Sequence, residues 1–151
     1  MPVVHNFKTA VIMPDIANHN LKAGTLMALD VIRAELDHVD MILPLFDAYR
    51  IFYKQDSDQR NGRRFLEHRI KSGESVIFLA LDGEGAVGFT QLYPTFSSVS
   101  LKSQWILNDL FVAEDGRNQG VGALLLDRAK RFARETGAKG LVLQTQINNT
   151  P

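Results

Sequence analysis

The sequence contains no cysteine among its 151 residues. This absence excludes disulfide bonds, thiolate metal sites and a cysteine nucleophile. No apolar run approaches the ~20 residues that a membrane-spanning helix needs, and the N-terminus lacks the basic and apolar regions of a secretory signal. The net formal charge is zero, which argues against a protein that holds nucleic acid through its phosphates. We therefore expect a soluble cytoplasmic protein without a membrane or nucleic-acid partner.

The most informative stretch joins a strand to a helix through a loop with glycine. Residues 107–112 are mostly aliphatic, aromatic or β-branched, which favours a strand. The following Glu114-Asp115-Gly116 has the composition of a turn. From Val121 onward, apolar residues recur with the spacing of one helix face. Gly120 and Gly122 are therefore predicted at the N-terminus of a helix that directly follows a strand.

A helix N-terminus of this kind is a favourable place for an anion. Its first N–H groups have no partner within the helix, and the helix dipole adds partial positive charge. Arg117 adds a full charge nearby, so a phosphate or pyrophosphate would fit. Two glycines alone are more typical of an ordinary strand-to-helix turn. The spacing excludes the dinucleotide motif, because Leu125 stands three residues after Gly122, and the P-loop, because Ala123 and Leu124 follow that glycine.

The complete string resembles a known family motif. Arg117-Asn118-Gln119-Gly120-Val121-Gly122, preceded by Asp109-Leu110-Phe111-Val112, is similar to motif A of the GCN5-related N-acetyltransferase (GNAT) superfamily, [RQ]-x-x-G-x-[GA] between a strand and a helix. The resemblance runs from about Met27 to Pro151. It implies an α/β (α+β) fold with a mixed, mostly antiparallel sheet flanked by helices. It also implies direct acetyl transfer from acetyl-CoA to an amine while both substrates are bound.

The sequence pattern agrees with the element order β-α-α-β-β-β-α-β. We expect an N-terminal extension over 1–26, with a short strand near residues 10–13, and a GNAT domain over 27–151. Asp37 or Asp40 would cap the first helix, and Asp56-Ser57-Asp58 would form the loop and N-cap before the second. Pro94 would end the strand that contains it. The predicted strands span about 28–36, 75–81, 86–93, 104–112 and 140–146, and the predicted helices end near 55, 72 and 136.

The resemblance also concerns the C-terminal end. Asn149-Thr150-Pro151 resembles the start of the family's N-x-x-A segment, after which family members continue into a further helix and two strands. That further segment normally carries a tyrosine near the CoA sulfur. We therefore expect a domain that lacks its C-terminal part and has an unpaired edge on its last strand. Either the chain is a fragment, or a second copy completes the groove. The resemblance implies a homodimer.

The contacts with the acyl carrier are implied by the resemblance, residue by residue. The backbone of Leu110, Phe111 and Val112 would pair with the pantetheine arm, and one N–H would polarise the thioester carbonyl. Asn149 would also contact this arm. The pyrophosphate would be held by the backbone of seven consecutive residues: Arg117, Asn118, Gln119, Gly120, Val121, Gly122 and Ala123.

The chemistry requires a base, because an ammonium group with a pKa near ~10.4 must lose a proton before it attacks. Asp109 lies in an apolar strand, where a carboxylate is either paired or functional, and the sequence leaves both roles open. Spermidine/spermine acetyltransferases show a similar Glu-Asp-Phe-Phe-Val string, in which Asn108 replaces the first acid. The acceptor would contact Asn108, Tyr93 and Phe96. Core packing is the favoured role of Tyr49 and Tyr53.

We therefore expect an N-acetyltransferase with acetyl-CoA as co-substrate and without a metal. The acceptor would be a small-molecule or peptide amine: a polyamine, a lysine side chain, an amino acid or an aminoglycoside-like compound. Residues 91–98 and 107–112 also resemble a GNAT subgroup with yeast proteins that acetylate histones and polyamines. The alternatives are a catalytically silent acyl-CoA-binding or dimerisation module and a phosphate-binding structural protein.

Overall fold

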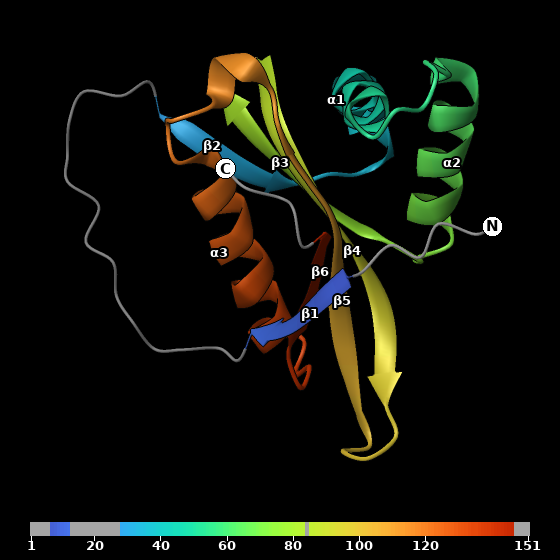
Figure 1. The fold of residues 1–151 in the computed structure, drawn as a ribbon, viewed down its shortest axis with the longest axis vertical. Coiled ribbons are helices and arrows are strands. Elements are labelled where there is room, and N and C mark those ends of the chain that lie inside the picture. Colours follow the sequence, from blue (N-terminus) through green and yellow to red (C-terminus); the bar gives the residue numbers. More distant parts are fainter. Residues whose placement is uncertain (1–6, 13–27, 84, 147–151) are drawn as a thin grey trace.

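The computed structural model describes residues 7–12, 28–83 and 85–146. In this part of the chain, one six-stranded sheet has two helices on one face and a third helix on the other (Figure 1). The strands are β1 (Phe7–Ile12), β2 (Leu29–Arg33), β3 (Val76–Asp82), β4 (Gly85–Ser97), β5 (Lys102–Val112) and β6 (Leu141–Gln146), and the helices are α1 (Val39–Phe52), α2 (Gln59–Lys71) and α3 (Val121–Glu135). None of these helices is long and apolar enough to cross a membrane.

The sheet has the order β1-β6-β5-β4-β3-β2. All neighbouring strands run antiparallel except β5 and β6, which are parallel. The mixed, mostly antiparallel sheet is therefore confirmed, and so is the element order from β2 onward. The β4–β5 hairpin extends well beyond the other strands (Figure 1).

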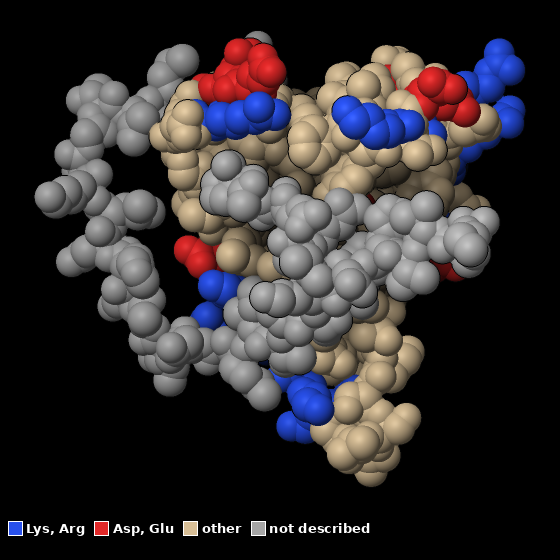
Figure 2. Space-filling model, viewed as in Figure 1, with Lys and Arg blue, Asp and Glu red and all other residues tan. Residues whose placement is uncertain are grey.

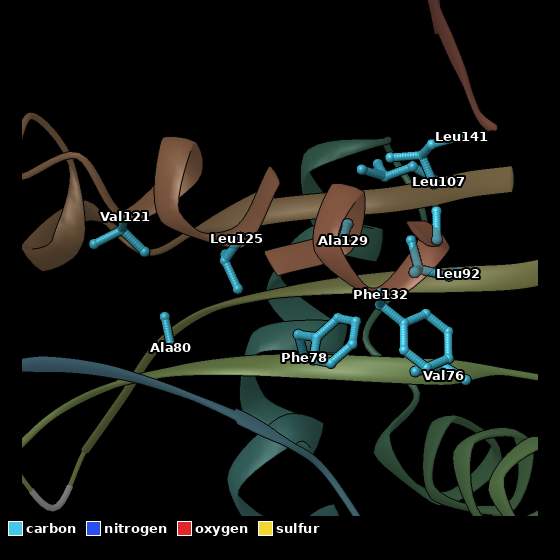
Figure 3. Packing of buried hydrophobic residues seen from close by; sticks show 11 residues of the cluster. Val76, Phe78, Ala80, Leu92, Leu107, Val121, Leu125, Ala129, Phe132 and Leu141 are labelled. Atoms are coloured by element: carbon cyan, nitrogen blue, oxygen red, sulfur yellow. The ribbon is translucent and has the colours of Figure 1, made fainter. Parts of the chain in front are cut away.

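The α3 face of the sheet holds one hydrophobic cluster. Leu125 and Ala129 of α3 are fully buried, and Phe132 packs its ring edge-on against Phe78 of β3 with centroids 5.5 Å apart. Figure 3 shows Leu125, Ala129 and Phe132 of the helix beside strand residues such as Phe78 and Leu92. The apolar face predicted from Val121 onward therefore fixes α3, and with it the loop that precedes the helix.

The opposite face holds a second cluster under α1 and α2. Ile42 of α1 and Leu66 of α2 are fully buried against Leu79 and Phe89 of the sheet. Phe46 bridges the two helices, because its ring stacks on Phe65 of α2 with centroids 5.9 Å apart. The sheet is therefore buried on both faces, as the continuous apolar run in β3 predicts.

The prediction that Pro94 ends its strand is wrong, since β4 continues to Ser97. Pro94 is in register with Trp105, whose N–H donates instead to Gly140 at 3.1 Å. The backbone nitrogen of Pro94 therefore points away from β5. On that side β3 is absent, because its first residue, Val76, is in register with Leu92. A proline is tolerated where no ladder needs its N–H.

The predicted caps have mixed outcomes. Neither Asp37 nor Asp40 caps α1, whose N-cap position is His38. The chain enters α1 through a short 3₁₀ turn, in which Glu35 donates its N–H to Nδ1 of His38 at 2.9 Å. Asp58 does cap α2, accepting from the N–H of Asn61 at 3.0 Å, as its place before that helix predicts.

The prediction of an unpaired edge on the last strand is also wrong. All six residues of β1 pair antiparallel with β6, from Phe7 opposite Gln146 to Ile12 opposite Leu141. A segment assigned to the N-terminal extension thus contributes the strand beside β6, because the ladder groups of β6 are available on that side. The homodimer and the boundary at residue 26 stay predictions.

Gly88 allows β4 to lie close to α3, and its replacement gives a test of this packing. A Cβ at Gly88 would lie 2.9 Å from the carbonyl oxygen of Phe111 and 3.1 Å from Cγ1 of Val121. We expect Gly88→Ala to lower the free energy of unfolding by about 1–3 kcal/mol in urea titrations. Gly85→Ala on the same strand is the control: its Cβ would meet only an ordinary contact at 3.7 Å, so a change within about 0.5 kcal/mol is expected. Equal effects of the two variants would contradict the packing argument.

Candidate functional site

A β-bulge in β5 places two consecutive polar residues on the same side of the sheet. Gln91 of β4 is in register with Asp109, whereas the next residue, Leu92, is in register with Leu107, so Asn108 is the extra residue. In a regular strand, neighbouring side chains point to opposite faces. The bulge interrupts this alternation, and both Asn108 and Asp109 line the same cavity.

This cavity has a volume of about 390 Å³ and lies between α1, α2 and the two long strands. Its walls are largely aromatic, and Asp109 supplies the carboxylate in the lining. The lining residues are Phe46, Tyr49, Arg50, Asn61, Gly62, Phe65, Tyr93, Asn108 and Asp109. A small, mostly apolar cavity with a few convergent polar groups is typical of a ligand site.

Asp109 is only 4% exposed and is held by amide donors. Nε2 of Gln91 donates to Oδ2 of Asp109 at 2.7 Å, and Nδ2 of Asn108 donates to Oδ1 at 2.9 Å. The same Nε2 of Gln91 lies 3.1 Å from the hydroxyl of Tyr93. These contacts fix the direction of the carboxylate without supplying a cation that would neutralise it.

Burial consequently dominates the ionisation of this site. It raises the pKa of Asp109 above its ordinary value, and hydrogen bonding from Gln91, Tyr49 and Asn108 acts in the opposite direction. Burial, followed by the negative charge of Asp109, raises the pKa of Tyr93 to about 12 and also raises that of Tyr49. Asp109 is therefore a better proton acceptor than an exposed aspartate, and the two hydroxyls stay protonated at neutral pH.

At the edge of β5 that faces β6, the described strands separate after Leu107. The parallel pairing with β6 covers only Trp105, Ile106 and Leu107. Ala113 donates its N–H to Val87 of β4 at 2.9 Å, so alternation along the strand directs the N–H and C=O groups of Leu110 and Val112 away from β4. Among the described residues no strand pairs with these backbone groups on that side, and the carbonyl of Val112 is contacted only by Nε of Arg117, at 3.3 Å.

The loop after β5 leaves a row of backbone N–H groups without an acceptor. Gly120 is the N-cap residue of α3, with φ of +79°, and no atom lies within 4 Å of the position that a Cβ would take. The first bond of the helix runs from Leu124 to Gly120 at 3.0 Å. Among the described residues, no acceptor contacts the N–H groups of the following set, which we call the amide row: Asn118, Gln119, Gly120, Val121, Gly122 and Ala123.

Several predicted site residues are placed elsewhere. The N–H of Arg117 already donates to Glu114 at 3.1 Å, and its Nε contacts the carbonyl of Val112 at 3.3 Å, so it does not belong to the amide row. The backbone groups of Phe111 face β4 by the same alternation. Phe96 is 80% exposed near the hairpin tip, outside the cavity. Asn149 lies outside the described residues.

Three residues of the site were missed or given another role. Tyr49, favoured for the core, packs edge-on against Phe89 and also lines the cavity. Gln91 was not singled out, although it is a polar residue in an apolar strand and is fully buried. The argument applied to Asp109, that a buried polar group must be paired or functional, would have found Gln91 as well. No sequence signal places Arg50 in the cavity.

Comparisons with known proteins agree on one family. Residues 40–151 match the family described as Acetyltransferase (GNAT) family. The chain is 47% identical to the uncharacterized N-acetyltransferase YhfO of Bacillus subtilis over 80% of its length and 81% of the relative, and 36% identical to a probable acetyltransferase of Haemophilus influenzae over 80% and 83%. A crystal structure of a probable acetyltransferase superimposes with a TM-score of 0.75 and 49% identity, covering 79% of this chain and 81% of the other.

The raised pKa of Asp109 predicts how this group affects stability. A carboxyl group with a higher pKa in the folded than in the unfolded state contributes stability that is fully present below the unfolded pKa, near ~4. This contribution is lost as the pH rises through the folded pKa. We therefore expect Asp109→Asn to gain stability relative to the wild type between pH 4 and pH 8, as measured by urea unfolding at each pH. A variant that instead loses relative stability as the pH rises would show that the ionised carboxylate is a structural group.

Proposed function

The chain belongs to the acetyltransferase (GNAT) family and is an acyltransferase, and from this premise we propose that it moves an acetyl group from acetyl-CoA to a primary amine. The observation that carries the proposal is the position of β5 between two complementary features. Its open edge and the amide row lie on one side, and the cavity with Asp109 lies on the other. A thioester bound along the edge would present its carbonyl to an amine in the cavity.

The open edge fits the acyl carrier. The backbone groups of Leu110 and Val112 would pair with the amides of the pantetheine arm, as a further strand does. The amide row would hold the pyrophosphate, because unpaired N–H groups at a helix N-terminus favour negative charge. The open space around Gly120 lets a phosphate approach the backbone. The N–H of Leu110 would polarise the thioester carbonyl in the way an oxyanion donor does.

Transfer then requires two proton movements. Asp109 takes one proton from the ammonium group, and the neutral nitrogen attacks the acetyl carbon, which forms the N–C bond. The tetrahedral intermediate expels the CoA sulfur with the electron pair of the C–S bond. The thiolate takes the second proton from the nitrogen, so the products are the amide and free CoA, and Asp109 returns its proton to water. A carboxylate with a raised pKa suits this role because its affinity for a proton is closer to that of the amine.

Gln91 serves as a positioning residue in this scheme. Its Oε1 is buried and has no partner among the described residues, whereas its Nε2 holds Asp109. Rotation of the amide would turn Oε1 toward Asp109, where it accepts a hydrogen bond from the protonated acid. Gln91 is therefore suited to both protonation states of a base that must gain and lose a proton in each cycle.

Gly120 provides a direct test of the amide row. A side chain at this position would project into the space that the pyrophosphate needs, so we expect Gly120→Leu to weaken acetyl-CoA binding at least roughly tenfold in calorimetric titrations. Gly137→Leu is the matched control. Gly137 follows the other end of α3, has φ of +66° and also has no atom within 4 Å of a Cβ. Both variants carry the same backbone strain, so equal losses of affinity would contradict the proposed pyrophosphate site.

Asp109 provides the test of catalysis. We expect Asp109→Asn to lower kcat by about 10²–10⁴-fold at neutral pH, since general-base catalysis contributes that much, and to leave acetyl-CoA affinity unchanged. The measurement is CoA release with a panel of amines. The wild-type rate should rise with pH as Asp109 loses its proton, and this limb should be absent in the variant. Unchanged kinetics would remove Asp109 from the mechanism. Tight acetyl-CoA binding without turnover of any amine would indicate the silent binding module instead.

A further inference from the structure

Resting on the proposed function, we infer that the acceptor is a small amine with a single positive charge that also carries an anionic group, as an amino acid does. The charged side chains that line the cavity are one carboxylate, Asp109, and one guanidinium, Arg50. A ligand with one amine and one acid group matches this pair. The polyamine and the aminoglycoside-like compounds, which the sequence left open, do not match it.

The charges around the cavity disfavour a polycation. Asp109 serves the reacting amine, so a second ammonium group would need another carboxylate in the lining, where the structure places Arg50 instead. A second guanidinium, that of Arg69, lies over the ring of Phe65 at 5.3 Å from its centroid, and its charge lowers the pKa of Tyr93 against the effect of burial. Arg69 is paired with Glu74 at 3.0 Å, so the repulsion of a second ammonium group comes mainly from Arg50.

The described part of the protein contacts only one nitrogen of the Arg50 guanidinium group, Nη1. Its Nη1 donates to the carbonyl of Asp56 at 3.1 Å and lies 3.9 Å from Oδ1 of Asp47. Asp47 is itself fixed, because it accepts from the hydroxyl of Ser57 at 2.6 Å and from the N–H of Asp58 at 3.0 Å. A guanidinium has five N–H donors, and among the described residues Nε and Nη2 have no acceptor. These donors remain for a carboxylate, which arginine binds in a bidentate manner.

The other lining residues of the cavity indicate what kind of body the acceptor carries between its amine and its acid group. The rings of Phe46, Phe65, Tyr49 and Tyr93 contribute to the lining, and the first two are stacked on each other. Such walls favour an apolar or aromatic body over a hydroxyl-rich one. A volume of about 390 Å³ is near the lower end for ligand sites, which suits a small molecule.

In the described part of the chain, charged side chains near α2 pair with one another. Figure 2 shows blue and red atoms side by side over the top of the molecule, so the visible charges there are mixed. Near α2, Arg63 pairs with Asp40 and contacts Glu67 at 3.6 Å. The carboxylates of this region are thus already engaged with cations of the protein.

The experiment compares amines in matched pairs that differ only in the acid group: phenylalanine with phenethylamine, tyrosine with tyramine, and 4-aminobutyrate with propylamine, with spermidine as the polycation. We expect kcat/KM of the wild type to be at least roughly tenfold higher for the acid-bearing member of one or more pairs, and spermidine to be poor. In Arg50→Gln the ratio within that pair should fall roughly 10- to 100-fold, toward one.

The controls separate charge from folding. Arg64→Gln removes the same charge from the exposed face of α2, outside the cavity, and should leave the ratio unchanged. Arg50→Lys keeps the charge but not the bidentate geometry, so it should retain part of the preference. Acetyl-CoA affinity, measured for every variant, shows that the domain is folded, since its proposed site lies on the other side of β5.

Each contrary result has a separate meaning. If spermidine or the decarboxylated amines are the better acceptors, or if Arg50→Gln leaves the ratio unchanged, the inference is overturned and the proposed function stands. If acetyl-CoA binds but no acid-bearing amine is acetylated, the inference is likewise overturned. If acetyl-CoA does not bind at all, the proposed function is wrong, and the inference about the acceptor, which rests on it, is wrong as well.

Discussion

The site depends on one additional residue in a single pair of strands. Asn108 has no partner in β4, and the ladder is shifted by one position between Leu107 and Asp109. Before this point β5 pairs with β6, and after it β5 continues with β4 alone. The bulge therefore coincides with the place where the sheet opens and where two polar side chains face the same cavity. A regular β5 would send Asn108 and Asp109 to opposite faces.

The rest of the structure holds this irregular strand in position. Helix α3 is anchored by Leu125 and Ala129 on one face of the sheet, and α1 and α2 are anchored by Ile42 and Leu66 on the other. The first cluster fixes the amide row at the start of α3, and the second fixes the aromatic walls of the cavity. Two hydrophobic clusters, one on each face of the sheet, thus hold the amide row and the cavity walls in position.

Asp109 illustrates why such a site has a cost in stability. Burial without a cation raises its pKa, so its ionised form at neutral pH is less favourable than it would be in water. The amides of Gln91 and Asn108 reduce this cost without removing it. A purely structural acid would be expected near a cation, as Asp47 is near Arg50. The contrast between these two aspartates is the physical reason for assigning a chemical role to only one of them.

The sequence by itself determined the elements and the loop before α3, because apolar periodicity and the positions of glycine act locally. It determined that Gly120 and Gly122 begin a helix and that Asp58 caps another. The sequence did not predict the features that depend on neighbouring strands. Pro94 stays in β4 because no third strand needs its N–H, and the edge of β6 is occupied by a segment distant in the sequence. Only the tertiary structure brought Arg50, Gln91 and Tyr93 to Asp109. The shifted strand register and the packing of α1 on the sheet depend on contacts between distant segments, which the sequence pattern does not show.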